Sequence, residues 1–136
     1  MRLVIDTSVL LSALISTASP SAQILALWRS RKFELLTSAE QIEEIARVTR
    51  YPRSRARLAP ALAGRLVNRL RDVAIVVGKL PKVDRSPAEP GQAHFLVTGD
   101  NPLLALKRHK STRIVTPAAL LHQMMERSKI VGSANR

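Results

Sequence analysis

The sequence predicts an α/β fold in which a mostly parallel sheet is flanked by helices, giving three layers. Short apolar runs alternate along the chain with segments whose apolar residues recur at helical spacing. Strands that alternate with helices form βαβ units, whose right-handed crossovers give a parallel sheet covered on both faces. The 136 residues leave room for one domain. We expect this single domain over residues 1–128 and a frayed C-terminal tail over 129–136.

Five short apolar runs are expected to form the strands, and the runs at 2–6 and 73–77 are expected to be buried. These strands are residues 2–6, 33–37, 73–77, 94–98 and 113–115. Three helix starts carry a capping hydroxyl, at Ser19, Ser38 and Thr116, and two of them have proline at the first helical position. The expected helices cover 9–15, 20–30, 38–50, 61–71, 103–108 and 117 to about 126, with apolar stripes at Ile42, Ile45 and Val48 and at Leu62, Leu66 and Leu70.

The charge balance favours a polyanionic partner, with nucleic acid as the leading class. Lys and Arg number 22 against 10 for Asp and Glu, which gives a net charge of +12. The excess is concentrated between residues 45 and 82, where Asp72 is the one acid among many basic residues. Aromatic residues make up only 3%, so base-stacking platforms are largely missing. Contacts with RNA would therefore go to backbone phosphates.

Composition also excludes several classes of site. The chain has no cysteine, which removes disulfides, thiolate zinc sites and a cysteine nucleophile. No apolar run reaches the roughly 18 to 20 residues that span a bilayer. The N-terminal apolar stretch contains Asp6, unlike a signal sequence. We expect a cytoplasmic protein with no membrane association.

Three acids stand where this topology would bring side chains together. Asp6 ends the first strand, Asp100 follows the strand at 94–98, and Glu44 lies in the helix after the second strand. Clustered carboxylates repel one another unless a hard cation lies among them, and their oxygens suit Mg²⁺ or Mn²⁺. Such a site can support phosphoryl chemistry. Each acid alone has a simpler interpretation, as a helix cap or as a solvated surface residue.

The segments around these acids are more specific than the acids themselves. VIDTSVLLSAL, LLTSAEQIEEIARV and FLVTGDNPLLAL occur in this order along the chain. The sequence thereby resembles the PIN domain family, in particular the bacterial VapC-like toxin components of toxin-antitoxin systems, over nearly its whole length. The resemblance implies a PIN-like fold and a hydrolase, a Mg²⁺- or Mn²⁺-dependent endoribonuclease.

The resemblance also assigns roles to particular residues. It implies that Asp6, Glu44 and Asp100 are the catalytic and metal-binding acids and that Ser8 and Thr98 support the site. Glu40 and Glu43 stay open as register alternatives to Glu44. It implies RNA and an antitoxin protein as partners. The arginines that we expect to position RNA are Arg47, Arg50, Arg53, Arg55 and Arg57.

The sequence departs from the family pattern between Gly78 and Gln92. Glu89-Pro90 resembles the family's Asp-Pro, which places the neutral Gln92 where a third metal-binding aspartate belongs. The crossover helix that normally follows is missing from the sequence. We therefore expect one sheet face to lack its cover, and a second copy of the chain or a partner protein to pack there. A homodimer is the expected assembly.

Two further interpretations stay open beside the ribonuclease. The first is a catalytically degenerate PIN protein that binds RNA or an antitoxin without cutting. The second is a helix-turn-helix around residues 38–71 with arginines on DNA phosphates, which the flanking strands disfavour. His94, His109 and His122 are too widely spaced for a recognisable zinc motif, and we interpret them as surface or packed residues.

Overall fold

A six-stranded sheet in the order β3-β2-β1-β4-β6-β5 forms the centre of the molecule. The computed structural model describes residues 1–77 and 93–134, and of 128–134 it describes the backbone alone. All neighbouring strands pair in parallel except β5 and β6. The strands are β1 (Arg2–Ile5), β2 (Glu34–Ser38), β3 (Ile75–Val77), β4 (Phe95–Val97), β5 (Arg108–His109) and β6 (Thr112–Val115). The predicted α/β class with a mostly parallel sheet is confirmed.

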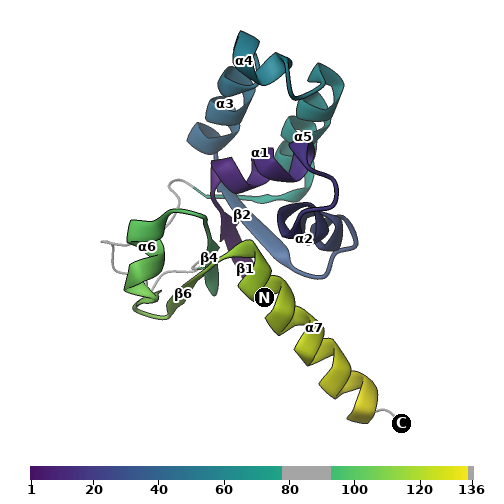
Figure 1. Ribbon diagram of the computed structural model, residues 1–136, viewed down its shortest axis with the longest axis vertical. Coiled ribbons are helices and arrows are strands. Elements are labelled where there is room, and N and C mark those ends of the chain that lie inside the picture. Colours follow the sequence, from purple (N-terminus) through teal and green to yellow (C-terminus); the bar gives the residue numbers. More distant parts are fainter. Residues whose placement is uncertain (78–92, 135–136) are drawn as a thin grey trace.

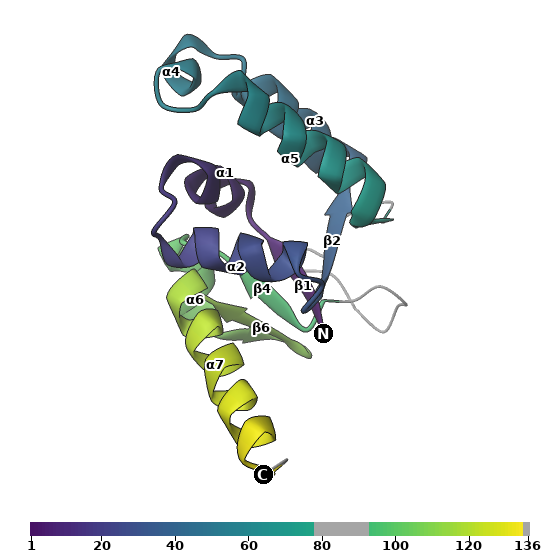
Figure 2. The same ribbon diagram turned by 90° about the vertical axis from the view of Figure 1, so that its right-hand side faces the viewer.

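The described residues also form helices on either side of this sheet. They are α1 (Thr7–Ile15), α2 (Pro20–Arg29), α3 (Ala39–Val48), α4 (Pro52–Arg55), α5 (Pro60–Val73), α6 (Asn101–Leu106) and α7 (Pro117–Ala134). Helices α3 and α5 lie side by side at one end of the molecule with α4 at their tip, and α7 extends from the other end (Figures 1 and 2). Within residues 1–77 and 93–134, no single helix is both long enough and apolar enough to cross a membrane. Helices α1 and α2 meet these two criteria only when they are counted as one segment, and that segment is bent by 96°.

The three predicted helix caps are confirmed by hydrogen bonds. Ser19 accepts from the Ala22 N–H, Ser38 from the Gln41 N–H, and Thr116 from the Ala119 N–H. In each case a side-chain hydroxyl oxygen satisfies an N–H that the first turn of a helix leaves without a partner. These helix starts could therefore be identified from local sequence.

The larger part of the core lies between the sheet and the helices α1, α2, α3 and α5. Leu3, Ile5 and Leu35 project from the strands into this cluster, where they meet Leu10 and Ile24. Successive strand residues point to opposite faces, so Val4 and Leu36 belong to a second, smaller cluster. The sheet is thus apolar on both faces, as expected for parallel strands.

The centre of the second sheet face is covered, contrary to the prediction that it would be exposed. Val4, Leu36 and Ala93 are all buried, and Ile114 of β6 is buried as well. A second copy is not needed to bury these four side chains, and its packing at this face stays a prediction. The predicted absence of a crossover helix, like Gln92, falls within residues 78–92, outside the described residues.

Other elements differ from the prediction for local physical reasons. The strand predicted at 73–77 is shorter and is not buried as expected, because β3 lies at the edge of the sheet and, among the described strands, pairs with β2 alone. Val76 is 50% exposed. The stripe on α5 runs through Ala63, Leu66, Val67 and Leu70, whereas Leu62 lies at the margin and is exposed.

The segment before β6 also differs. The helix predicted at 103–108 spans Asn101–Leu106 and ends there because Lys107 adopts φ 62°, which breaks the helical backbone. Two elements were not predicted, α4 and the short strand β5, which forms an antiparallel hairpin with β6. Helix α7 was expected to end near Glu126 and instead continues to Ala134, through residues that were assigned to the tail.

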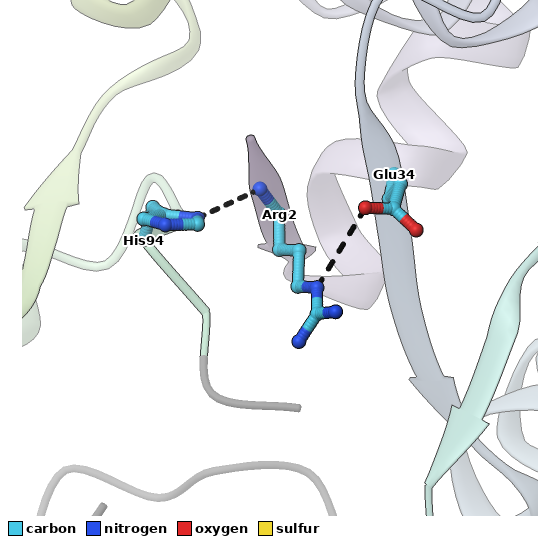
Figure 3. Close-up of polar contacts among 3 residues, drawn as sticks. All are labelled: Arg2, Glu34 and His94. Carbon is cyan, nitrogen blue, oxygen red and sulfur yellow. Dashed lines mark hydrogen bonds and ion pairs between the residues drawn. The ribbon is translucent and has the colours of Figure 1, made fainter. Parts of the chain in front are cut away.

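Polar contacts hold the other end of β1, away from the strand ends that carry the acids. The Arg2 N–H donates to His94 Nδ1 at 2.9 Å, and the His94 N–H donates to the Arg2 carbonyl at 2.8 Å (Figure 3). Arg2 Nε also lies 3.7 Å from Glu34 Oε1, an exposed pair of the kind that contributes about 0 to 1 kcal/mol. His94 thus joins β4 to β1 and serves a structural purpose.

We predict that Leu36→Ala lowers the free energy of unfolding by about 2 to 5 kcal/mol, because Leu36 is fully buried and truncation leaves a cavity. Urea unfolding followed by circular dichroism measures the change. The matched control is Leu106→Ala, since Leu106 is 52% exposed, and its effect should stay within about 0.5 kcal/mol. Equal effects from both substitutions would show that the second face is not part of the core.

Candidate active site

Two aspartates meet at the carboxyl ends of the neighbouring strands β1 and β4. Asp6 directly follows β1, and Asp100 follows β4 after Thr98 and Gly99. The Thr98 hydroxyl donates to Asp6 Oδ2 at 2.9 Å, and its oxygen accepts from the Asp100 N–H at 3.0 Å. The Asp6 N–H donates to the Val97 carbonyl at 2.9 Å. One threonine side chain therefore links the two acidic segments.

Solvent exposure increases from Thr98 to Asp6 and then to Asp100. Thr98 is fully buried, Asp6 is half-buried and Asp100 is exposed. Thr98 is thus a fixed support, while the carboxylates reach the surface where a substrate could approach. This arrangement agrees with the general rule that open parallel sheets bind ligands at the carboxyl ends of their strands.

The two aspartates do not serve as helix caps. Asp6 and Asp100 occupy the positions before α1 and α6, but neither side chain accepts a hydrogen bond from its helix. Among the described residues, neither carboxylate forms an ion pair. The simpler interpretation of these acids, as N-caps, therefore does not account for their side chains.

A buried glutamine that no sequence motif indicated contacts the same carboxyl end of β1. Gln41 Nε2 donates to the Ile5 carbonyl at 2.8 Å and to Thr7 Oγ1 at 3.4 Å, and Oε1 accepts from the Thr37 hydroxyl at 2.7 Å. Because Ile5 immediately precedes Asp6, these bonds fix the backbone that carries the carboxylate. The available signal was the position of Gln41 beside the buried stripe of Ile42 and Ile45.

Glu44 lies on α3, three residues after Gln41, and its side chain is exposed. Glu40 and Glu43, the register alternatives, are exposed as well. In the described ranges 1–77 and 93–134, no three His, Cys, Asp or Glu side chains form a group that could hold a metal ion. The hydrogen bonds thus connect Asp6 with Asp100, and they do not include Glu44.

The supporting residues named from the sequence take different positions. Thr98 makes both hydrogen bonds that join the aspartates. Ser8 lies in the first turn of α1 and is exposed. Its neighbour Thr7 is the residue that meets Gln41.

The five arginines expected to bind RNA are all exposed and lie at or near the tip formed by α3 and α4 (Figure 2). We call Arg47, Arg50, Arg53, Arg55 and Arg57 the arginine tip. Arg47 follows Gln41 by six residues, about 9 Å along the helix axis. The arginine tip therefore begins in the last turn of α3 and continues beyond the outer end of this helix, while Gln41 lies near its inner end, at the carboxyl ends of the strands.

The comparison with family models identifies the fold. A model described as a PIN domain matches residues 2–102, which include Asp6, Glu44 and Asp100. The chain belongs to the PIN domain family, and its fold is of the nuclease type. No curated protein and no solved structure gave a significant match.

PIN domains generally depend on divalent metal ions, and the chemistry of the two aspartates suits such an ion. Carboxylate oxygens are the ligands that Mg²⁺ and Mn²⁺ prefer. Asp6 uses one oxygen to accept from Thr98, and its other oxygen accepts no hydrogen bond within the described part of the chain. Asp100 contributes a second carboxylate from the neighbouring strand end. Asp6 and Asp100 are thus the described residues whose chemistry would suit such an ion.

We predict that Thr98→Val lowers the free energy of unfolding by roughly 1 to 3 kcal/mol, because it leaves Asp6 Oδ2 without its donor and the Asp100 N–H without its acceptor. The substitution keeps the shape of the side chain. Thr98→Ser is the matched control, because it retains the hydroxyl and should cost less. A valine variant as stable as the serine variant would contradict this role of Thr98.

Proposed function

We propose that this chain is a metal-dependent endoribonuclease of the PIN toxin type, which hydrolyses RNA phosphodiester bonds. The observation that carries the proposal is the pair Asp6 and Asp100, linked through buried Thr98 at adjacent strand ends of a PIN domain. Their carboxylates have no cationic partner among the described residues, although the chain has a net charge of +12. A pair of unneutralised acids in so basic a chain is best explained by a ligand that carries positive charge.

Asp6 and Asp100 would hold Mg²⁺ or Mn²⁺, and Glu44 would contribute from α3. When bound, the cation would activate a water molecule and neutralise charge on the scissile phosphate. The chain's own residues prepare this site. Thr98 holds one oxygen of Asp6, and Gln41 holds the Ile5 carbonyl and Thr7 on either side of it. Thr98 and Gln41 thereby restrict the conformations open to Asp6, and a restricted carboxylate favours a defined coordination geometry.

RNA would be held by the arginine tip through its phosphates. The five guanidinium groups are exposed and follow the outer half of α3 and the α4 region. Arginine binds phosphate oxygens in a bidentate manner, and the low aromatic content of the chain argues against base stacking. Affinity at this surface would therefore be electrostatic and only weakly dependent on sequence.

A second candidate is a degenerate PIN domain that binds RNA or an antitoxin without cutting. It is favoured by Glu44, which forms no metal-ligand group with the two aspartates in the described part of the chain. Loss of a third carboxylate would lower the charge that holds a divalent ion. The homodimer, the antitoxin partner and the cytoplasmic location stay predictions.

We predict that the purified protein cleaves RNA with Mn²⁺ or Mg²⁺ and that Asp6→Asn and Asp100→Asn each lower the rate by at least about 100-fold, since each removes a charged ligand. Single-turnover cleavage of a labelled RNA measures the rate. Asp72→Asn is the matched control, because Asp72 is an exposed acid on α5.

The comparison of Glu44→Gln with Glu43→Gln then identifies the helix acid. Loss of cleavage in Glu44→Gln alone is the expected result. RNA binding that needs no metal, with no cleavage by the unmodified chain, would reject the nuclease and support the binding module. Equal losses in Asp6→Asn and Asp72→Asn would show that the effect is not specific to the site.

We also predict that combining Arg50→Ala, Arg53→Ala and Arg55→Ala weakens RNA binding and makes the dependence of log K on log salt shallower by roughly 2, because about 0.7 counterions are released per phosphate of a single strand. Fluorescence anisotropy at several salt concentrations measures the slope. Arg71→Ala, an exposed arginine on α5 outside the arginine tip, is the control. An unchanged slope in the triple variant would remove the arginine tip from the RNA surface.

A further inference from the structure

An open apolar groove of about 620 Å³ lies between α2 and α7, outside the candidate active site. Helix α2 packs against α7 along this groove. Leu27, Leu121 and Met124 are half-buried in its floor, and Met125 is 54% exposed. Lys32 and Arg127 lie among the residues that line it, and both are exposed. Apolar side chains thus remain accessible beside two cationic groups.

This surface is separate from the elements that carry the aspartates. The groove involves neither Asp6, Thr98 nor Asp100, and Leu121, Met124, Met125 and Arg127 lie beyond the residues 2–102 that match the family model. Helix α7 extends away from the sheet (Figures 1 and 2). A groove formed with a projecting helix is a suitable place for another polypeptide to bind.

The charges and shape of the groove indicate what could occupy it. No acidic side chain lines it among the described residues, so an occupant gains from carrying carboxylates opposite Lys32 and Arg127. The described part of the chain also contributes no aromatic residue to its lining, which disfavours nucleic-acid bases. A second copy of this chain would bring a net charge of +12 against the same cationic groups. Flexible methionines such as Met124 and Met125 adapt to a helical partner.

We propose that the α2–α7 groove binds an acidic amphipathic helix of a partner protein. The helix would place its apolar residues on Leu27, Leu121 and Met125 and its carboxylates near Lys32 and Arg127. This is recognition of a helix in a groove, in which apolar residues spaced by one turn supply affinity and the charges fix orientation. The proposal does not depend on the ribonuclease activity, since its test involves neither metal nor cleavage.

The experiment uses the full chain with a reporter in the groove. The protein has no cysteine, so Gln23→Cys, at an exposed lining position, takes a single environment-sensitive fluorophore. The probe is a synthetic amphipathic helix with leucine on one face and glutamate on the other. Control peptides replace the glutamates by lysine or the leucines by alanine. We expect saturable binding of the Leu/Glu peptide and at least about tenfold weaker binding of both controls.

Substitutions in the groove test where the peptide binds. Met125→Glu and Arg127→Glu should each weaken binding of the Leu/Glu peptide by about tenfold, the loss typical of a central contact. The matched controls are Leu106→Glu and Arg71→Glu, at exposed positions outside the groove, and they should change binding less than twofold. Because all four positions are exposed, the variants should unfold at nearly the temperature of the parent protein.

Several results would overturn the proposal. Equal binding of the Leu/Glu and Ala/Glu peptides, or equal weakening by Arg71→Glu and Arg127→Glu, would show attraction to net charge alone. The same response from a fluorophore on Asn68→Cys of α5 would show that the reporter does not detect the groove. Self-association that Met125→Glu abolishes would assign the groove to a second copy. Displacement of the peptide by RNA from the groove reporter would assign it to nucleic acid.

Discussion

The parallel pairing of β1 with both β2 and β4 is the constraint on which the candidate site depends. Parallel strands end at the same edge of a sheet, so this pairing gathers Asp6, Ser38 and Thr98 at one place although they are far apart in the chain. Ser38 begins α3 and thereby brings Gln41 to the Ile5 carbonyl. Thr98 completes the arrangement by bonding to Asp6 and to the backbone of Asp100.

Charged side chains of opposite sign lie in two separate regions of the molecule. The two aspartates lie at the sheet edge without an ion pair in the described part of the chain, while the arginine tip lies at the outer end of α3. This separation leaves the acids available to a cation and the guanidinium groups available to phosphates. Direct pairing of arginine with aspartate would have neutralised both. The proposed nuclease would need this division, since its substrate would be a polyanion and its catalytic site would be acidic.

Apolar side chains are buried on both faces of the sheet, whereas some remain accessible beside the projecting helix α7. Val4 and Leu36 are buried on the second face, so that face does not supply an exposed interaction surface at its centre. Accessible apolar surface remains between α2 and α7, where Met125 lies beside exposed cations. Partner binding is therefore better sought on the side of α7 than on the sheet.

Apart from α4 and β5, the sequence by itself determined the strand and helix order, the three hydroxyl caps and the location of Asp6 and Asp100, because these depend on local patterns of a few residues. It did not determine the roles of Gln41 and Thr37, whose hydrogen bonds join residues of separate elements, nor the exposure of Val76 and Leu62, which depends on what packs beside them. The assignment of Glu44 rests on resemblance, since periodicity places Glu40 and Glu44 on similar faces of α3. Only the tertiary structure decided which side chains meet, because long-range strand pairing sets those contacts and no short segment encodes it.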